Sequence, residues 1–288
     1  MRPSHTPMLS LVFPVVPRGR AVKTPLAIGI ATLLAGCLAL APAGAQDMLR
    51  HLDLNSPQMT TAELSRADVV ALIAAAKPGQ PVDLAGRRLN GLDLSGLDLT
   101  GANFRVALLN GTKLAGAELD GAQFDQAWMM KIDLSGASLR KASLFGTQAQ
   151  DGRFNGADLA GARIAGDFSR ADFSGARLAG VNFSADMRNQ SMGLMRGVLN
   201  SANLDGADLE AANLSRAQLN FATLRGANLT SASLVGMEAA GADFTGADVA
   251  GADFKGADVD SARLIGLVGL EAAKNLEAAK NLGLSIRK

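Results

Sequence analysis

Side chains able to act as catalysts or metal ligands are few in this sequence and lie far apart. His5 and His51 are the only histidines, and Cys37 is the only cysteine. A Ser-His-Asp triad needs a histidine held in a scaffolded cleft, and zinc sites need Cys or His at short fixed spacings. His51 lies in a polar stretch, and no such spacing occurs. We therefore expect no catalytic residue, no bound metal and no cofactor.

Carboxylates and glycines are abundant, but their placement is regular. Asp93 and Asp98 each precede a large apolar residue, as most aspartates here do. The glycines never form a Walker loop or a strand-to-helix GxGxxG, and the calcium-binding GGxGxD pattern of some β-helices is absent. Regularly spaced carboxylates are typical of solvated repeat positions, so an enzyme is not expected.

The elements that carry these residues follow a five-residue period. From Leu84, every fifth residue as far as Ile164 is large and apolar except Ala149. A small residue usually stands two positions before each centre, and glycine often stands two positions after it. Period five fits neither an amphipathic helix nor a plain strand, and a fixed short period indicates a repeat architecture. The predicted core includes Leu94, Leu99, Phe104, Phe124, Phe154, Phe173, Leu204, Leu209, Phe244 and Phe254.

A coil that turns a corner every five residues satisfies this period. The centre and the small residue before it point inward, and glycine tolerates the tight corner. Four sides then make a coil of about twenty residues, and coils stack at about 4.8 Å, the ordinary strand spacing. Phe104 and Phe124, twenty residues apart, should therefore stack, as should Phe154 and Phe173 once one missing residue is restored.

The repeats resemble those of the pentapeptide-repeat family, whose unit reads A-(D/N)-L-x-x. Four segments match this unit closely: Ala202 to Gly206, Ala207 to Leu209, Ala227 to Leu229 and Ala242 to Gly246. The resemblance covers about two thirds of the chain, from near Val82 to near Ile265. It implies an all-β solenoid, a right-handed quadrilateral β-helix.

The N-terminus has the pattern of an export signal. Basic residues precede an apolar run from Leu26 to Leu40, and Ala43-Gly44-Ala45 offers a cleavage site. Leu34 to Cys37 also matches the bacterial lipobox, in which the cysteine becomes lipid-modified. The sequence leaves both routes open, and both place the protein outside the cytoplasm, in the periplasm or envelope, with at most a lipid anchor.

These patterns divide the chain into segments. Thr60 to Glu63 resembles a capping box, so a helix is expected from about Thr61 to Ala76 as a cap on the first coil, or else as a partner-binding arm. Near the C-terminus, a repeated Leu-Glu-Ala-Ala-Lys-Asn favours a short closing helix and a frayed tail. The predicted segments are a signal peptide at 1–45, a linker at 46–60, a capping helix at 61–80, the solenoid at 81–266 and a C-terminal cap and tail at 267–288.

One interruption and one aromatic residue stand out as contact candidates. The period drops one residue between Ile164 and Phe168, which we expect to be missing from a corner, and breaks over 185–198, where a loop is expected. Trp128 is predicted to point outward, and an exposed aromatic beside methionine is typical of contact hot spots. The candidate contact residues are Trp128, Met130, Met187, Arg188 and Met192, although a covering element over Trp128 or a functionless excursion would fit equally.

The charge of the chain bears on its partners. Removing residues 1–45 takes away four positive charges, so the net charge changes from +1 to −3, and Val82 to Ile265 holds 17 basic and 21 acidic residues. Without a basic stripe, no nucleic-acid binding is expected. The sequence favours a non-enzymatic scaffold or protein-binding module of the bacterial envelope, with partner and oligomeric state unknown. The alternative comes from the resemblance, because some family members mimic B-DNA and inhibit DNA gyrase.

Overall fold

The computed structural model describes residues 53–77, 79–187 and 195–288. The chain divides into two units, Met1–Gly44 and Ala45–Lys288, and the described residues all belong to the second. The predicted signal peptide at 1–45, with Cys37, lies outside the described residues, as do His51, Arg188 and Met192. None of the described helices has the length and apolar character needed to span a bilayer.

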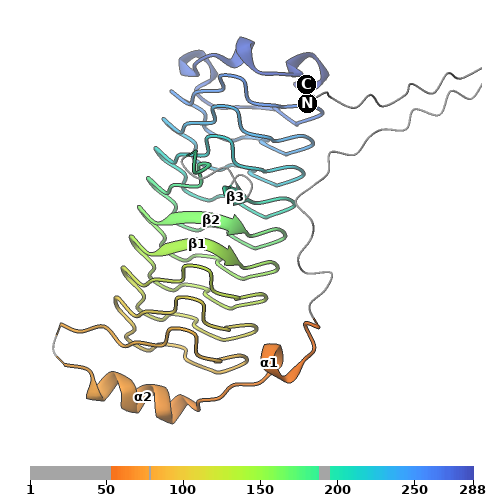
Figure 1. The fold of residues 1–288 in the computed structure, drawn as a ribbon. Helices are drawn as coiled ribbons and strands as arrows, with labels where there is room; N and C mark the ends of the chain where they lie inside the picture. The colour runs from red at the N-terminus through yellow and green to blue at the C-terminus, as the bar shows by residue number, and fades with distance from the viewer. Residues whose placement is uncertain (1–52, 78, 188–194) are drawn as a thin grey trace, which may run out of the picture. The chain divides into compact units, whose positions relative to one another are not determined.

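The body of the second unit is a stack of four-sided coils (Figure 1). Parallel bridges join residues twenty apart, as in Asp83 to Asn103 and on to Gln123, and a new bridge starts every five residues. Four columns of bridges result, one on each side of the coil. We number the sides from the N-terminus, so that the first side starts at Asp83, the second at Arg88, the third at Asp93 and the fourth at Asp98.

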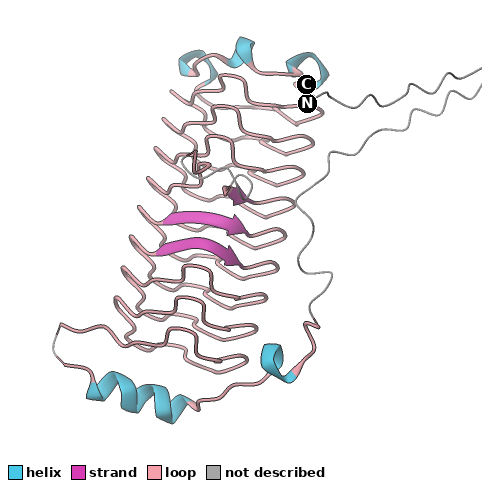
Figure 2. Cartoon of the chain, in the orientation of Figure 1, coloured by secondary structure: helices cyan, strands magenta, loops and turns pink. Residues whose placement is uncertain are grey.

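Most of each coil pairs through single bridges rather than long strands, so Figure 2 shows few strands. The exceptions are β1 (Ser143–Gln148), β2 (Arg163–Asp167) and β3 (Gly197–Val198), which form a parallel sheet in the order β1-β2-β3. These three run through the corner between the first and second sides.

The core is the dry interior of the coil. All ten of the core residues predicted above are buried, with at most 1% of each side chain exposed. The rings of Phe104 and Phe124 are parallel, 4.8 Å apart, and those of Phe154 and Phe173 lie 4.6 Å apart, which confirms the predicted stacking.

The polar residue before each centre has a local structural role. The Asp98 carboxylate accepts a hydrogen bond from the Thr100 amide at 3.1 Å, and Asp93 accepts one from Ser95 in the same way. This contact supports the turn that follows the apolar centre, which explains why Asp or Asn recurs at that position. The glycine or other residue at the corner has a positive φ, as at Gly96, and closes the turn.

The missing residue lies at a corner, as the sequence analysis predicts. In the pairing of β1 with β2, Phe145 lies opposite Ala165 and Thr147 lies opposite Gly166, so Gly146 has no partner. The next coil carries the interruption at the same corner. Leu199 is buried at the central position of the second side, so the period resumes there.

The N-terminal segment differs from the expected linker and helix. A single helical turn, α1 (Pro57–Thr60), lies inside the predicted linker, and α2 runs over Arg66–Ala75, with Ser65 and Asp68 forming its capping box. The expected capping box was wrong because Glu63 is used elsewhere. Its amide donates to the Arg88 carbonyl, and its carboxylate pairs with arginines of the first coil.

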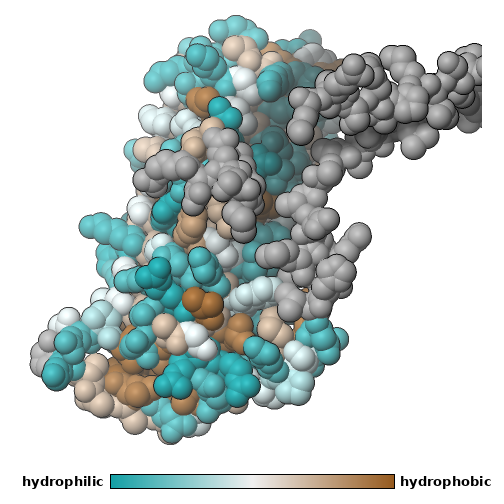
Figure 3. Space-filling model, in the orientation of Figure 1, coloured by the Kyte–Doolittle hydropathy of each residue, from teal (hydrophilic) through white to brown (hydrophobic). Residues whose placement is uncertain are grey.

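Helix α2 packs across the first coil (Figure 1). Val69 is fully buried in the core cluster, and Leu64 and Ile73 pack against it. Arg66 donates to the carbonyls of Asp93 and Ser95. Figure 3 shows apolar side chains gathered toward this end of the stack, where Val70 and Leu72 are more than a third exposed.

The C-terminal segment is one more coil rather than a single closing helix. Three of its sides are six residues long, because Val268, Lys274, Lys280 and Ile286 bridge the four columns in turn. The extra residue in each side is accommodated by three 3₁₀ turns, η2 (Leu270–Ala272), η3 (Leu276–Ala278) and η4 (Leu282–Leu284). Ile286 is paired on both backbone groups, so the tail expected to fray from Ser285 is held at that residue.

Candidate functional site

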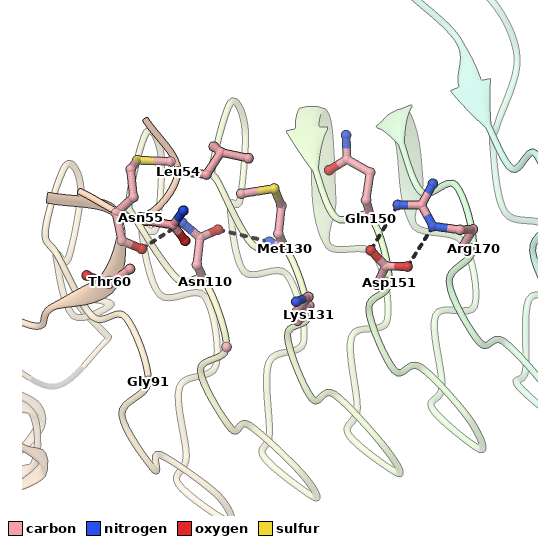
Figure 4. Close-up of a pocket in the computed structure, with 12 residues that line it drawn as sticks. Leu54, Asn55, Thr60, Gly91, Asn110, Met130, Lys131, Gln150, Asp151 and Arg170 are labelled. Carbon is pink, nitrogen blue, oxygen red and sulfur yellow. Dashed lines mark hydrogen bonds and ion pairs between the residues drawn. The ribbon is translucent and has the colours of Figure 1, made fainter. Parts of the chain in front are cut away.

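A groove runs along the second side, between α1 and the corner residues of five successive coils (Figure 4). Its volume is about 590 Å³. We call it the α1 groove and define it by these lining residues: Leu54, Asn55, Met59, Thr60, Gly91, Asn110, Gly111, Met130, Lys131, Gln150, Asp151 and Arg170. It combines one apolar wall with one charged wall.

An amide ladder fixes the apolar wall. The Asn90 side chain accepts from the Asn110 amide at 2.9 Å, and the Asn110 side chain accepts from the Met130 amide at 3.0 Å. The Nδ2 groups of the same two asparagines donate hydrogen bonds to backbone carbonyls of the α1 segment. Asn90 donates to the Gln58 and Thr61 carbonyls, and Asn110 donates to the Met59 carbonyl at 3.2 Å. Met130 of the coil is thereby set opposite the α1 segment (Figure 4).

The charged wall consists of corner residues on successive coils. Arg170 donates to both oxygens of Asp151, at 2.7 and 2.9 Å, in a bidentate pair. Hydrogen bonds from Arg170 hold the pKa of Asp151 below its usual value, and the Lys131 charge acts in the same direction. Lys131 forms no salt bridge among the described residues.

Gln150 lies between the two walls and is 5% exposed. Its amide nitrogen donates to Gln148 Oε1 at 3.0 Å and to Asp167 Oδ2 at 2.8 Å. Two acceptors on the nitrogen fix the orientation of the amide. Its Oε1 is buried and has no hydrogen-bond partner among the described residues, which is a costly arrangement.

The contact residues predicted from sequence do not form one site. Met130 lines the α1 groove, whereas Trp128 is half-buried in the second-side column between Leu108 and Gln148 and does not line it. Met187 is 47% exposed and lines a different groove of about 460 Å³, with Arg163 and Asp186.

Sequence reasoning missed Lys131, Gln150 and the α1 segment. Gln150 follows Ala149, the one small centre in the first run of repeats, and this departure from the pattern was the available signal. The position of α1 depends on hydrogen bonds between residues more than twenty-five positions apart in the sequence, which no local pattern reveals.

The described residues contain no group of three or more His, Cys, Asp or Glu side chains placed to hold a metal ion. The α1 groove also brings together no pair of nucleophile and base. Its chemistry is that of a contact surface, with methionine side chains, a lysine and a buried amide oxygen.

Coil, corners and groove together define a repeat solenoid whose sides present side chains in columns. The model of pentapeptide repeats matches in eight copies, over residues 82–116, 98–136, 167–185, 198–230 and 224–264. The chain belongs to the pentapeptide-repeat family.

One solved structure agrees with this assignment. HetL of the cyanobacterium Nostoc sp. strain PCC 7120, a pentapeptide-repeat protein involved in heterocyst differentiation regulation, is 28% identical, with a TM-score of 0.55 over 77% of this chain and 99% of that one. Rfr23 of the cyanobacterium Cyanothece 51142 is 25% identical over 42% of this chain and 91% of that one, with a TM-score of 0.22.

A third structure is QnrB1, a plasmid-mediated fluoroquinolone resistance protein. It is 17% identical over 67% of this chain and 90% of that one, with a TM-score of 0.37. No curated protein matches the chain.

Proposed function

We propose that this protein is a non-enzymatic scaffold of the bacterial cell envelope, a right-handed quadrilateral β-helix that binds a protein partner through its second side. The observation that carries the proposal is the α1 groove, which Met59, Met130, Lys131 and Gln150 line together. Methionine adapts to irregular partners, and Lys131, which forms no salt bridge among the described residues, favours a partner that brings a carboxylate.

A protein segment supplies these features together. An extended backbone carries N–H donors, an apolar side chain can pack on Met130, and a carboxylate can pair with Lys131. Trp128 lies on the same side, one residue before the buried Met129, and would extend the contact beyond the groove.

Photo-crosslinking in cells tests this assignment. A photoreactive residue at Met130 is expected to capture a discrete envelope protein, and Lys131→Glu is expected to abolish the crosslink. Ala160 is the matched control, because it occupies the same repeat position on the fourth side and is similarly half-buried. Equal capture from position 160 would contradict a specific second-side contact.

Export is proposed from the sequence pattern at 1–45. Fractionation of cells expressing the full chain, with and without Cys37→Ser, checks it. A lipid-anchored form is expected to leave the membrane fraction in the variant, whereas a conventionally cleaved form is expected to be periplasmic in both cases. Recovery of the uncleaved chain in the cytosol would refute export.

One observation favours the alternative, a DNA-mimicking gyrase inhibitor. The fourth-side column is rich in carboxylates: Asp98 and Glu118 are neighbours, and Asp158, Asp208 and Asp248 lie farther along the same column, separated by one residue each. Arg177 interrupts the column, and Arg140 pairs with Asp120 beside it. A supercoiling assay with purified gyrase separates the two functions, because only the alternative predicts inhibition that is lost on Asp158→Lys with Asp208→Lys.

A further inference from the structure

A second groove lies at the corner between the first and second sides, among the C-terminal coils. Its volume is about 470 Å³, and its charged lining residues are Arg196, Arg216, Glu238, Lys255 and Lys280. We call it the basic groove. Four cations against one carboxylate give it an excess of three positive charges, whereas the solenoid as a whole has more acidic than basic residues.

One of the four cations is neutralised and fixed in place. Arg196 Nη1 lies 2.7 Å from Glu238 Oε1 and also donates to the Arg216 carbonyl at 3.0 Å. Gln218 donates to the other Glu238 oxygen at 2.9 Å. Burial raises the pKa of Glu238, but these hydrogen bonds from Arg196 and Gln218 lower it by more, so the pair stays ionised.

The other three cations have no such partner. Arg216, Lys255 and Lys280 are exposed, and none of them forms a salt bridge among the described residues. Asp258 precedes Lys280 in the second-side column, and its Oδ1 accepts hydrogen bonds from Asn281 and from the Asp260 amide. The Lys255 charge also acts on Asp253, which lies on the first side. Even with Asp253 and Asp258 included, the cations outnumber the carboxylates by one.

The floor of the groove is made of glycine. A Cβ atom on Gly256 would meet no other atom within 4 Å, so the space above this residue is open. A Cβ atom on Gly236 would lie 3.5 Å from Arg216 Cγ, so the stem of Arg216 runs along the floor. Three unpaired cations therefore border one hollow, and the repulsion between like charges is relieved when an anion enters it.

We propose that the basic groove binds a phosphoryl group, either a small phosphate or diphosphate or the monoester head group of a lipid. A carboxylate would neutralise only one of the three free cations, whereas a phosphate monoester carries about −1.5 to −2 at neutral pH. The Arg216 guanidinium offers the planar fork that binds two phosphate oxygens, and the lysines contribute compact charges.

Calorimetric titration of the purified full chain with sodium pyrophosphate, in about 150 mM salt to screen non-specific attraction, tests the proposal. We expect saturable binding at one site. Lys255→Gln combined with Lys280→Gln should weaken it by about tenfold or more, and Arg216→Lys should weaken it less, because charge is kept and the fork is lost.

The matched control is Lys113→Gln combined with Lys141→Gln, which removes the same charge from exposed lysines on other sides. It should leave the affinity within about twofold of that of the unmodified chain. Thermal unfolding of every variant verifies that the fold is kept. Absence of saturable binding, or an equal loss in the control, would overturn the proposal.

A vesicle arm separates the two sources of phosphate. If the ligand is a lipid, vesicles containing phosphatidic acid should bind the chain, phosphatidylcholine vesicles should not, and pyrophosphate should compete. If pyrophosphate binds and neither vesicle does, the ligand is a small phosphate. Vesicle binding that survives Lys255→Gln with Lys280→Gln would refute the assignment to this groove.

Discussion

The rings of Phe154 and Phe173 stack 4.6 Å apart at an interplanar angle of 13°, although one residue fewer separates them than a regular coil requires. Their registry is kept because β2 is one residue shorter than β1 at the corner between the first and second sides. The missing residue is therefore lost from a surface turn and not from the core. Phe168 adds a tilted ring 5.8 Å from Phe154, so the aromatic cluster lies directly beside the irregular corner.

The first prediction concerns this aromatic cluster. Phe173→Ala should lower the free energy of unfolding by about 3–5 kcal/mol, because it deletes a fully buried ring and leaves a cavity. Urea denaturation followed by circular dichroism measures the change. Phe221→Ala serves as the control, since this ring is 68% exposed, and its effect should stay within about 0.5 kcal/mol. Equal losses in both variants would contradict the stacked core.

The second prediction concerns the shortened corner. A Cβ atom at Gly166 would lie 2.3 Å from the Thr147 carbonyl oxygen, so Gly166→Ala forces the backbone apart. We expect a marked fall in the thermal unfolding midpoint, together with loss of the folded yield. Gly156→Ala provides the comparison, because the space there is open and only the positive φ costs energy, about 1 kcal/mol. The order of the two midpoints is the test, and a Gly166 variant as stable as the Gly156 variant would refute the close approach.

The third prediction is a stabilising change. Val106 has a φ of 59° and is 55% exposed at its corner, where most other corners have glycine. A β-branched residue is strained in this conformation, so Val106→Gly should raise stability by about 1 kcal/mol. Scanning calorimetry would detect the higher midpoint. The midpoint of Val106→Ala should lie between those of the unmodified chain and Val106→Gly. A midpoint of Val106→Gly below that of the unmodified chain would show that the strain is absent.

The fourth prediction concerns acid stability. Hydrogen bonds from the Ser95 hydroxyl and amide lower the pKa of Asp93, and those from Thr100 lower the pKa of Asp98. Burial raises the pKa of Asp243, but hydrogen bonds from Thr245 and Arg225 lower it by more. A lowered folded pKa gives stability that is complete above the unfolded value of 3.8 and is lost as the pH falls further.

Thermal midpoints measured from pH 7 to pH 2 should therefore stay level down to about pH 5 and then fall steeply below about pH 4. Asp243→Asn should flatten part of this fall, because the amide oxygen can still accept from Thr245 but no longer titrates. A thermal midpoint that rises on acidification would contradict the lowered pKa values of these carboxylates.

The core was predictable from sequence because the residue pattern within each repeat determines which of its side chains are buried. The apolar centre, the small residue before it and the polar residue between them recur locally, so burial of residues such as Leu94 and Leu209 follows without knowledge of distant contacts. The same logic placed the missing residue at a corner, since only a surface turn can lose a residue without shifting the core.

The ends of the coil and the grooves were not predictable in the same way. Thr60 and Ser65 both precede an acidic residue at capping distance, and the choice between them depends on Glu63 being engaged by the first coil. The C-terminal repeat has strong helical propensity, but its pairing with the preceding coil overrides that preference. The basic groove joins residues from five different coils, so its charged residues are far apart in the sequence.

The six-residue sides of the last coil have a consequence for solubility. A stack of parallel coils is a template on which another chain could continue the ladder from the exposed edge. Here the last coil contains three extra residues, which the 3₁₀ turns η2, η3 and η4 take up, so the edge offered to an incoming regular coil is irregular in three places. We expect this irregular edge to disfavour end-to-end polymerisation of the molecule.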